Sequence, residues 1–189
     1  MELFEAIDNR RSFRAFTPEP VGREDIERIV AAGRMAPSSN NAQPWGFHVA
    51  TGETRAQVDQ VMERTTVYLD EYLAALGSEE RIAAATRFLS NLGGAPVVIA
   101  VSAPHVADEM ALVNTLVSIG AAIENILLGV TALGLGAVNV TFSYWVRDEL
   151  ADVFDIGTDR YIVSVIAVGH PDEGASSPAH DAKNVFWYE

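Results

Sequence analysis

The sequence predicts one globular domain that contains both helices and strands. The chain has 189 residues, of which 49% are hydrophobic, and this size and composition suit a single domain with a sizeable core. Residues 96–102 form an apolar run rich in valine, which is typical of a strand buried on both faces. Residues 109–133 follow a helical pattern and are almost entirely apolar over 119–133. Such a helix lies at the centre of a core or is shared with a second subunit.

The remaining elements follow from hydrophobic spacing and turn residues. A short amphipathic helix is predicted to end near Arg10, and Asp108 and Gly134 are predicted to begin and end the long helix. The segment 55–92 is predicted to be helical with a break near Gly77. The other predicted elements are a helix over 23–35, a polar loop over 36–45, a strand near 47–51, a strand over 137–141, a short helix over 145–154 and a strand over 161–168.

The last apolar segment, Val185 to Tyr188, contains three aromatic residues that would be costly to expose. One interpretation is a last strand on the edge of the chain's own sheet. The other is a strand added to the sheet of a partner subunit. The second interpretation also explains the apolar helix, and it favours a homodimer.

Composition excludes several classes of function. The 13 basic and 26 acidic residues give a net charge of -13, which argues against a nucleic-acid-binding surface. Without cysteine there is no disulfide, thiolate-metal or cysteine-nucleophile chemistry, so electron transfer would need a bound cofactor. The four histidines have no metal-ligand spacing, and no metal site is expected. The charged segment 1–14 does not suit a signal peptide, and the uncharged stretches 88–107 and 125–146 suit core elements better than membrane spans. A cytoplasmic protein is therefore expected.

Two segments could bind a ligand. Arg10, Arg11, Ser12 and Arg14 place three guanidinium groups and a hydroxyl within five residues, which suits a terminal phosphate. A charge cluster that complements the end of the preceding helix explains them equally well. The polar loop 36–45 suits hydrogen bonding to the edge of a planar heteroaromatic ligand, although a turn-rich connection explains it more simply. The sequence Gly-Leu-Gly at 134–136 precedes a strand, and it is better explained as a helix stop than as a dinucleotide-binding turn.

Taken together, these segments resemble the nitroreductase family of FMN-dependent oxidoreductases. The resemblance rests on Arg-Arg-Ser-Phe-Arg at 10–14, Ala-Pro-Ser-Ser-Asn-Asn-Ala-Gln-Pro-Trp at 36–45, Leu-Gly-Val-Thr-Ala-Leu-Gly-Leu-Gly at 128–136 and Val-Gly-His-Pro at 168–171. It implies one domain over 1–189 with an α+β fold, an α/β/α sandwich around a mainly antiparallel sheet. It also implies an intertwined homodimer with FMN at the subunit interface.

The resemblance assigns residues to FMN position by position. Arg10, Arg11, Ser12 and Arg14 would hold the phosphate and ribityl chain. From the second chain, Pro37, Ser38, Ser39 and Asn40 would approach the flavin, and Gln43 would support their loop. Backbone groups of Asn139, Val140 and Thr141 would face the ring, and Lys183, the only lysine in the chain, would complete the phosphate site.

The family's reaction would pass hydride from NADH or NADPH through the flavin to a small electron-poor acceptor such as a nitroaromatic or a quinone. It requires no catalytic acid or base from the chain, and none is assigned. The sequence departs from the family at Val138 to Phe142, where many members have a glycine, and at residues 179–181, where Ala-His-Asp replaces a basic pair. Two alternatives stay open: a dehydrogenase or oxidase of the same fold that uses FMN without a nicotinamide, and a non-catalytic flavin-binding protein.

Overall fold

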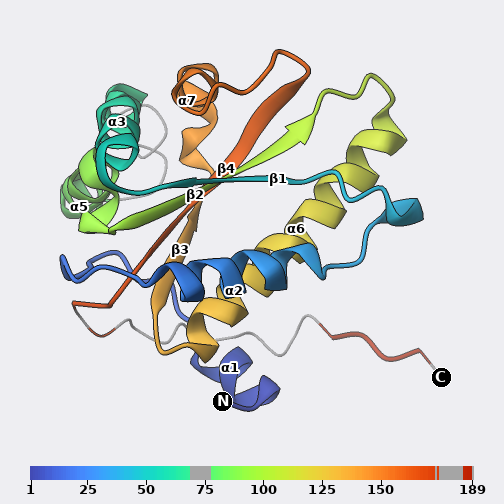
Figure 1. The fold of residues 1–189 in the computed structure, drawn as a ribbon, viewed down its shortest axis with the longest axis horizontal. Coiled ribbons are helices and arrows are strands. Elements are labelled where there is room, and N and C mark those ends of the chain that lie inside the picture. Colours follow the sequence, from blue (N-terminus) through green and yellow to red (C-terminus); the bar gives the residue numbers. More distant parts are fainter. Residues whose placement is uncertain (69–77, 173, 175–184, 189) are drawn as a thin grey trace.

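An antiparallel sheet forms the centre of the molecule in the computed structural model, which describes residues 1–68, 78–172, 174 and 185–188. Within these residues the sheet has four strands, in the order β1-β2-β4-β3 (Figure 1). The strands are β1 (Gly46–Ala50), β2 (Val97–Pro104), β3 (Gly136–Val140) and β4 (Arg160–Gly169). All three neighbouring pairs are antiparallel, so the predicted mainly antiparallel sheet is confirmed.

Helices cover both faces of this sheet (Figure 1). One face is covered by α2 (Arg23–Arg34) and the long α6 (Glu109–Ala132). The other is covered by α3 (Gly52–Glu63), α5 (Glu79–Asn91) and α7 (Arg147–Val153). Helix α1 (Leu3–Asn9) packs against α6. The arrangement confirms the α/β/α sandwich.

Successive side chains along a strand point to opposite faces of the sheet, so the protein has two separate hydrophobic cores. In β2, Val98 and Ala100 pack toward α3, α5 and α7, whereas Val97 and Ile99 pack toward α2 and α6. All four side chains are at most 1% exposed. Burying a valine or isoleucine side chain contributes about 1.5–3 kcal/mol, so a strand that is apolar at every position is stabilised from both layers.

Helix α6 begins and ends where the sequence predicts. The Asp108 carboxylate accepts a hydrogen bond of 2.8 Å from the Ala111 amide at its start, and Gly134 adopts φ +75° just beyond its end. Over 119–133, the stretch expected to be buried on all sides, no large hydrophobic side chain is exposed, whereas Met110 and Val117 in the first half of the helix are 66% and 68% exposed. In the described part of the chain, α6 is the one helix that is long and apolar enough to cross a membrane. Its inner face nevertheless packs into the core between sheet and α2.

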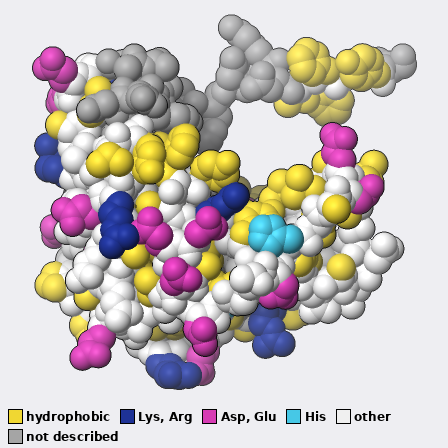
Figure 2. All heavy atoms as spheres, turned by 90° about the horizontal axis from the view of Figure 1, so that it is seen from above, with side chains coloured by type: hydrophobic (Ala, Val, Ile, Leu, Met, Phe, Trp, Pro, Cys, Tyr) yellow, Lys and Arg dark blue, Asp and Glu magenta, His cyan; other side chains and the backbone are white. Residues whose placement is uncertain are grey.

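Two further differences concern short segments. The predicted helix over 145–154 is divided into a 3₁₀-helix, η4 (Phe142–Val146), and α7, because the Tyr144 amide donates to the carbonyl of Thr141, three residues back, where an α-helix bonds four residues back. The tail Val185–Tyr188 joins none of the described strands, and its side chains stand apart from the body (Figure 2). All four side chains are at least 60% exposed.

Candidate functional site

The arginine segment runs along the free edge of β3. Ser12 forms a parallel bridge with Ala137, and the Phe13 amide donates to the Ala137 carbonyl at 3.1 Å. Phe13 also packs against the core between the sheet and α3, α5 and α7. Because Ala137 lies two residues before Asn139, the segment predicted to bind phosphate and the strand end predicted to face the flavin lie side by side.

The three guanidinium groups of this segment have different partners. Arg10 forms an ion pair with Glu124 of α6 at 3.3 Å, and both side chains are partly exposed. Arg11 donates to the carbonyls of Asp8 and Arg10 at 2.6 and 2.8 Å, at the end of α1. The Arg14 guanidinium is exposed and makes a 3.4 Å bond to the Ser12 carbonyl. Arg11 therefore does what the helix-end interpretation predicts, while exposed Arg14 is suited to an anion from solution.

A tight turn, η3 (Leu92–Gly94), supports the backbone of this segment from below. Gly93 adopts φ +68°, and its carbonyl accepts from the Phe16 amide at 3.0 Å. A Cβ at Gly93 would lie only 2.2 Å from the Arg14 carbonyl oxygen. Glycine is thus required here both by the left-handed backbone and by the close approach.

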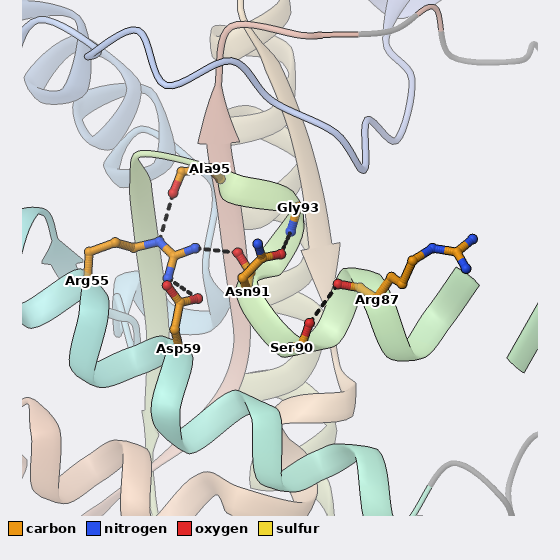
Figure 3. A network of polar contacts seen from close by, with 7 residues as sticks. All are labelled: Arg55, Asp59, Arg87, Ser90, Asn91, Gly93 and Ala95. Atoms are coloured by element: carbon orange, nitrogen blue, oxygen red, sulfur yellow. Dashed lines mark hydrogen bonds and ion pairs between the residues drawn. The ribbon is translucent and has the colours of Figure 1, made fainter. Parts of the chain in front are cut away.

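Buried Arg55 of α3 fixes that turn (Figure 3). It is 6% exposed, and its guanidinium donates to the Ala95 and Asn91 carbonyls, each at 2.8 Å. Its charge is paired with Asp59 one turn along α3. The Asn91 side chain accepts from the Gly93 amide at 3.1 Å. Sequence reasoning missed this network, and its one signal is the Gly-Gly pair that ends a predicted helix.

The end of β3 carries a polar atom without a partner. The Asn139 side-chain oxygen is buried, and no described residue donates a hydrogen bond to it. Val140 is buried beside it, while Thr141 is exposed. A buried amide oxygen left unpaired costs about 1–3 kcal/mol, so a ligand with an N–H at this point would be stabilised.

The polar loop 36–45 has a constrained shape. Asn40, Asn41 and Gln43 all adopt left-handed backbone angles, with φ of 51°, 55° and 46°. The Ser38 hydroxyl accepts from the Gln43 amide at 3.0 Å, and the Ser39 amide donates to Ser118 of α6 at 3.3 Å. Pro37 and Asn40 are exposed. The loop therefore presents a defined polar surface and is more than an unstructured connection.

Side chains from two strands hold the end of this loop. Arg160 of β4 donates to the Pro44 carbonyl at 2.8 Å, to the Ser102 carbonyl at 2.9 Å and to the Ser102 hydroxyl at 2.9 Å. That hydroxyl also lies 2.9 Å from His48 Nε2. A Cβ at Gly46 would lie 2.5 Å from Ser102 Oγ, so only glycine leaves room for the cluster.

Burial lowers the pKa of His48 below its ordinary value, and the nearby Arg160 guanidinium lowers it further. The imidazole is therefore neutral near pH 7, and its Nε2 can accept a hydrogen bond from the Ser102 hydroxyl. Sequence reasoning missed this cluster entirely, because its members come from three strands and no spacing along the chain connects them.

The two predicted halves of the site contact different turns of α6. The loop contacts α6 at Ser118 and the arginine segment contacts α6 at Glu124, six residues further along. That separation is about 9 Å along the helix axis, and the two segments leave α6 toward different ends of the molecule (Figure 1). Lys183 lies outside the described residues.

Comparisons with known proteins bear on the family and the fold. The model of the family described as the nitroreductase family matches residues 7–170. A protein named as an NADH dehydrogenase/NAD(P)H nitroreductase of Archaeoglobus fulgidus is 28% identical over 91% of this chain and 87% of its own. A shorter match is 42% identical to 4-nitrobenzoate reductase of Pseudomonas putida and spans only 25% of that protein.

Two solved structures are similar over the whole chain. The FMN and NADPH-dependent nitroreductase NfnB from a Sphigopyxis strain superposes with a TM-score of 0.81 at 22% identity, over 100% of this chain and 99% of its own, which is a likeness of fold. A protein named as a nitroreductase, in complex with FMN, from Desulfovibrio desulfuricans superposes with a TM-score of 0.76 at 27% identity, over 100% of this chain and 97% of its own.

Proposed function

Because the chain belongs to the nitroreductase family, we propose that it is a cytoplasmic FMN-dependent oxidoreductase that transfers hydride from NADH or NADPH to an electron-poor acceptor such as a nitroaromatic or a quinone. The observation that carries this proposal is the arginine segment bridged to β3 beside the unpartnered Asn139 oxygen. Arg10, Ser12 and Arg14 would hold FMN, which would supply hydride-transfer chemistry between the nicotinamide and the acceptor. For a nitro acceptor, NAD(P)H, a proton and the nitro compound yield NAD(P)⁺, the nitroso compound and water.

The residues of this segment fit FMN. Arg14 offers an exposed guanidinium to a phosphate, and Arg10 is held only by a partly exposed ion pair, which contributes little stability and is readily exchanged for a phosphate. Ser12 adds a hydroxyl at the same edge. The buried oxygen of Asn139 is an acceptor for the N–H of the flavin's pyrimidine ring.

The chain's own contribution would be to bind FMN and to orient it. Backbone pairing with β3 and the η3 turn holds the arginine segment in place before any ligand arrives, so less ordering remains to be done on binding. No described residue is assigned a proton-transfer role, since hydride transfer between nicotinamide and flavin needs none from the protein.

A complete site would take residues from two chains. The loop leaves α6 at Ser118 and the arginine segment at Glu124, and in a homodimer Pro37, Ser38, Ser39, Asn40 and Gln43 would serve the partner's flavin. The exposed outer face of α6, formed by Met110, Val113, Leu116 and Val117, supplies an apolar surface for such an interface.

The tail supports the same assembly. The edge of β1 is free in the described sheet, and beside it a groove of about 740 Å³ lies between α2 and β1. Its apolar lining includes Val21, Ile26 and Val49. The exposed tail of a second copy, Val185–Tyr188, is the extended apolar segment that would fill it by strand addition.

Absorbance spectroscopy tests the cofactor and the reaction. Purified protein should be yellow with flavin peaks, and NADH or NADPH should bleach them. Flavin that neither nicotinamide bleaches would reject the nicotinamide step and leave the two alternatives with the same fold. Colourless protein that does not take up added FMN would reject the whole proposal.

Sedimentation tests the assembly. Removal of residues 185–189 should weaken the dimer and lower FMN retention with it. A truncated protein that stays dimeric at the same concentration would show that the tail is not part of the interface.

A further inference from the structure

An aromatic cluster on the surface directly follows the strand end predicted to face the flavin. Trp145 stacks on Tyr68 with 4.9 Å between ring centroids and 13° between planes. Tyr144 meets Trp145 edge-on at 5.5 Å. The three residues are 38–57% exposed, although rings of this size are normally buried. Core packing therefore does not account for this cluster.

The cluster is tied to the candidate site through the backbone. Tyr144 lies three residues after Thr141, and its amide donates to the Thr141 carbonyl at 3.0 Å. A pocket of about 250 Å³ is lined by residues 144–149. It is smaller than the roughly 300–1,000 Å³ of pockets for drug-sized ligands, so it suits a molecule with one ring.

Arg147 adds a positive charge to the pocket. Its guanidinium lies 4.8 Å from the Tyr144 ring centroid and 5.8 Å from that of Tyr161. Its nearest acid, Asp148, is 3.7 Å away with a side chain that is 94% exposed, so water weakens that pair. The other acid of the pocket, Glu149, is paired with Arg64. Arg147 is therefore suited to bind an additional anion.

We propose that Tyr68, Tyr144, Trp145 and Arg147 form the acceptor subsite for planar single-ring aromatics that carry an acidic substituent. The ring packs against the indole of Trp145, and the carboxylate or phenolate of the acceptor pairs with Arg147. This assignment rests on the proposed function, because an electron-poor ring bound there would be reduced only with a flavin beside it to donate the electrons. A nitro group bound there takes up two electrons from NAD(P)H and two hydrogens, one as hydride and one as a proton, and releases water.

Equilibrium titration of the FMN-loaded protein with 4-nitrobenzoate and with nitrobenzene tests the subsite without turnover. Trp145→Ala should raise Kd about fivefold for both compounds, and Trp145→Phe should restore most of the affinity because it keeps a ring. Arg147→Gln should raise Kd about tenfold for 4-nitrobenzoate and less than twofold for nitrobenzene. Val67→Ala, which truncates an exposed neighbour of Tyr68 that lacks a ring, should leave both values unchanged.

Two results would overturn the assignment: a Trp145→Ala protein that binds both compounds as tightly as the original, or an Arg147→Gln protein that weakens both equally. KM values for the same compounds should follow the Kd values where turnover is measurable. Failure of NADH and NADPH to bleach the flavin would reject the proposed function instead, and the titration would still decide the subsite.

Discussion

The two halves of the candidate site are held in place by different means. The arginine segment is fixed by its backbone, through the bridge from Ser12 to β3 and the close packing of Arg14 on Gly93. The loop 36–45 is fixed by side chains that reach it from elsewhere, chiefly Ser118 and Arg160. The first half therefore tolerates changes in an exposed side chain such as Arg14, and the second depends on single distant residues.

This difference separates binding from positioning. In the arginine segment, backbone contacts hold the chain in place, so an exposed side chain such as Arg14 is available for a ligand. The loop also bonds internally, but positions outside it anchor it to the body, among them the cluster of Arg160, Ser102 and His48. Substitutions should consequently have distinguishable effects in the two halves.

The largest effect is expected at Gly93, where the backbone arrangement of the first half can be broken. Gly93→Ala should lower the free energy of unfolding by about 3 kcal/mol or more, because a left-handed alanine is strained and its Cβ meets the Arg14 carbonyl at 2.2 Å. Urea unfolding measures the loss. Flavin retention should fall with it, since Arg14 moves.

Gly52 provides the matched control. It adopts a similar φ of +55°, but a Cβ there would meet nothing within 4 Å. Gly52→Ala should therefore cost only about 1 kcal/mol, from the backbone strain alone. Equal losses at the two positions would show that contact with Arg14 does not matter.

Arg160→Met should affect the second half, with a loss of about 2 kcal/mol, because the Pro44 and Ser102 carbonyls lose a charged donor. Hydrogen exchange should become faster at the amides of loop 36–45 and stay unchanged in the arginine segment. Arg160→Lys should give an intermediate loss, since it keeps the charge but not the fork of donors. Faster exchange in both halves would contradict the separation.

Much of the fold could be predicted because its signals are local. The valine run over 96–102 predicts a buried strand. Asp108 and Gly134, at the two ends of an apolar stretch, predict where the long helix begins and ends. Less could be predicted where the outcome depends on partners distant in sequence or absent from the chain. The outer face of α6 is one such position, and the tail at 185–188, which joins no described strand of its own chain, is another.

The candidate site likewise contains residues that a local sequence motif predicts and residues that none predicts. The motif at 10–14 is a short run of one chemistry and was visible in the sequence, as was the polar loop. Arg55 and Arg160 were not, because each acts on carbonyl groups, which every residue has. Their partners at Asn91 and Pro44 lie 36 and 116 residues away, and no sequence pattern marks such bonds.

Arg14→Ala should sharpen the comparison by changing a ligand-facing side chain of the first half alone. FMN affinity should fall about tenfold, equivalent to about 1.4 kcal/mol, through loss of charge-assisted bonds to phosphate. The unfolding midpoint of the protein without FMN should stay within error, because the backbone holds this segment. Arg87→Ala removes the same charge from an exposed position on α5 and should leave FMN affinity unchanged. Full flavin affinity in Arg14→Ala would remove this residue from the proposed phosphate site.

The smallest effect concerns pH and the second half. Burial and Arg160 hold the pKa of His48 below its ordinary value of 6.5, which also describes the unfolded chain. Between the two pKa values the unfolded state binds more protons, so the stability contributed by neutral His48 is complete above about pH 6.5 and is lost as pH falls through the lower, folded value. A protonated ring would also repel Arg160 and cease to accept from Ser102. The free energy of unfolding should therefore decline more steeply from pH 7 to pH 5 in the original protein than in His48→Gln, which cannot titrate. Equal slopes would place His48 outside the anchor of the loop and leave Arg160 to hold Pro44 alone.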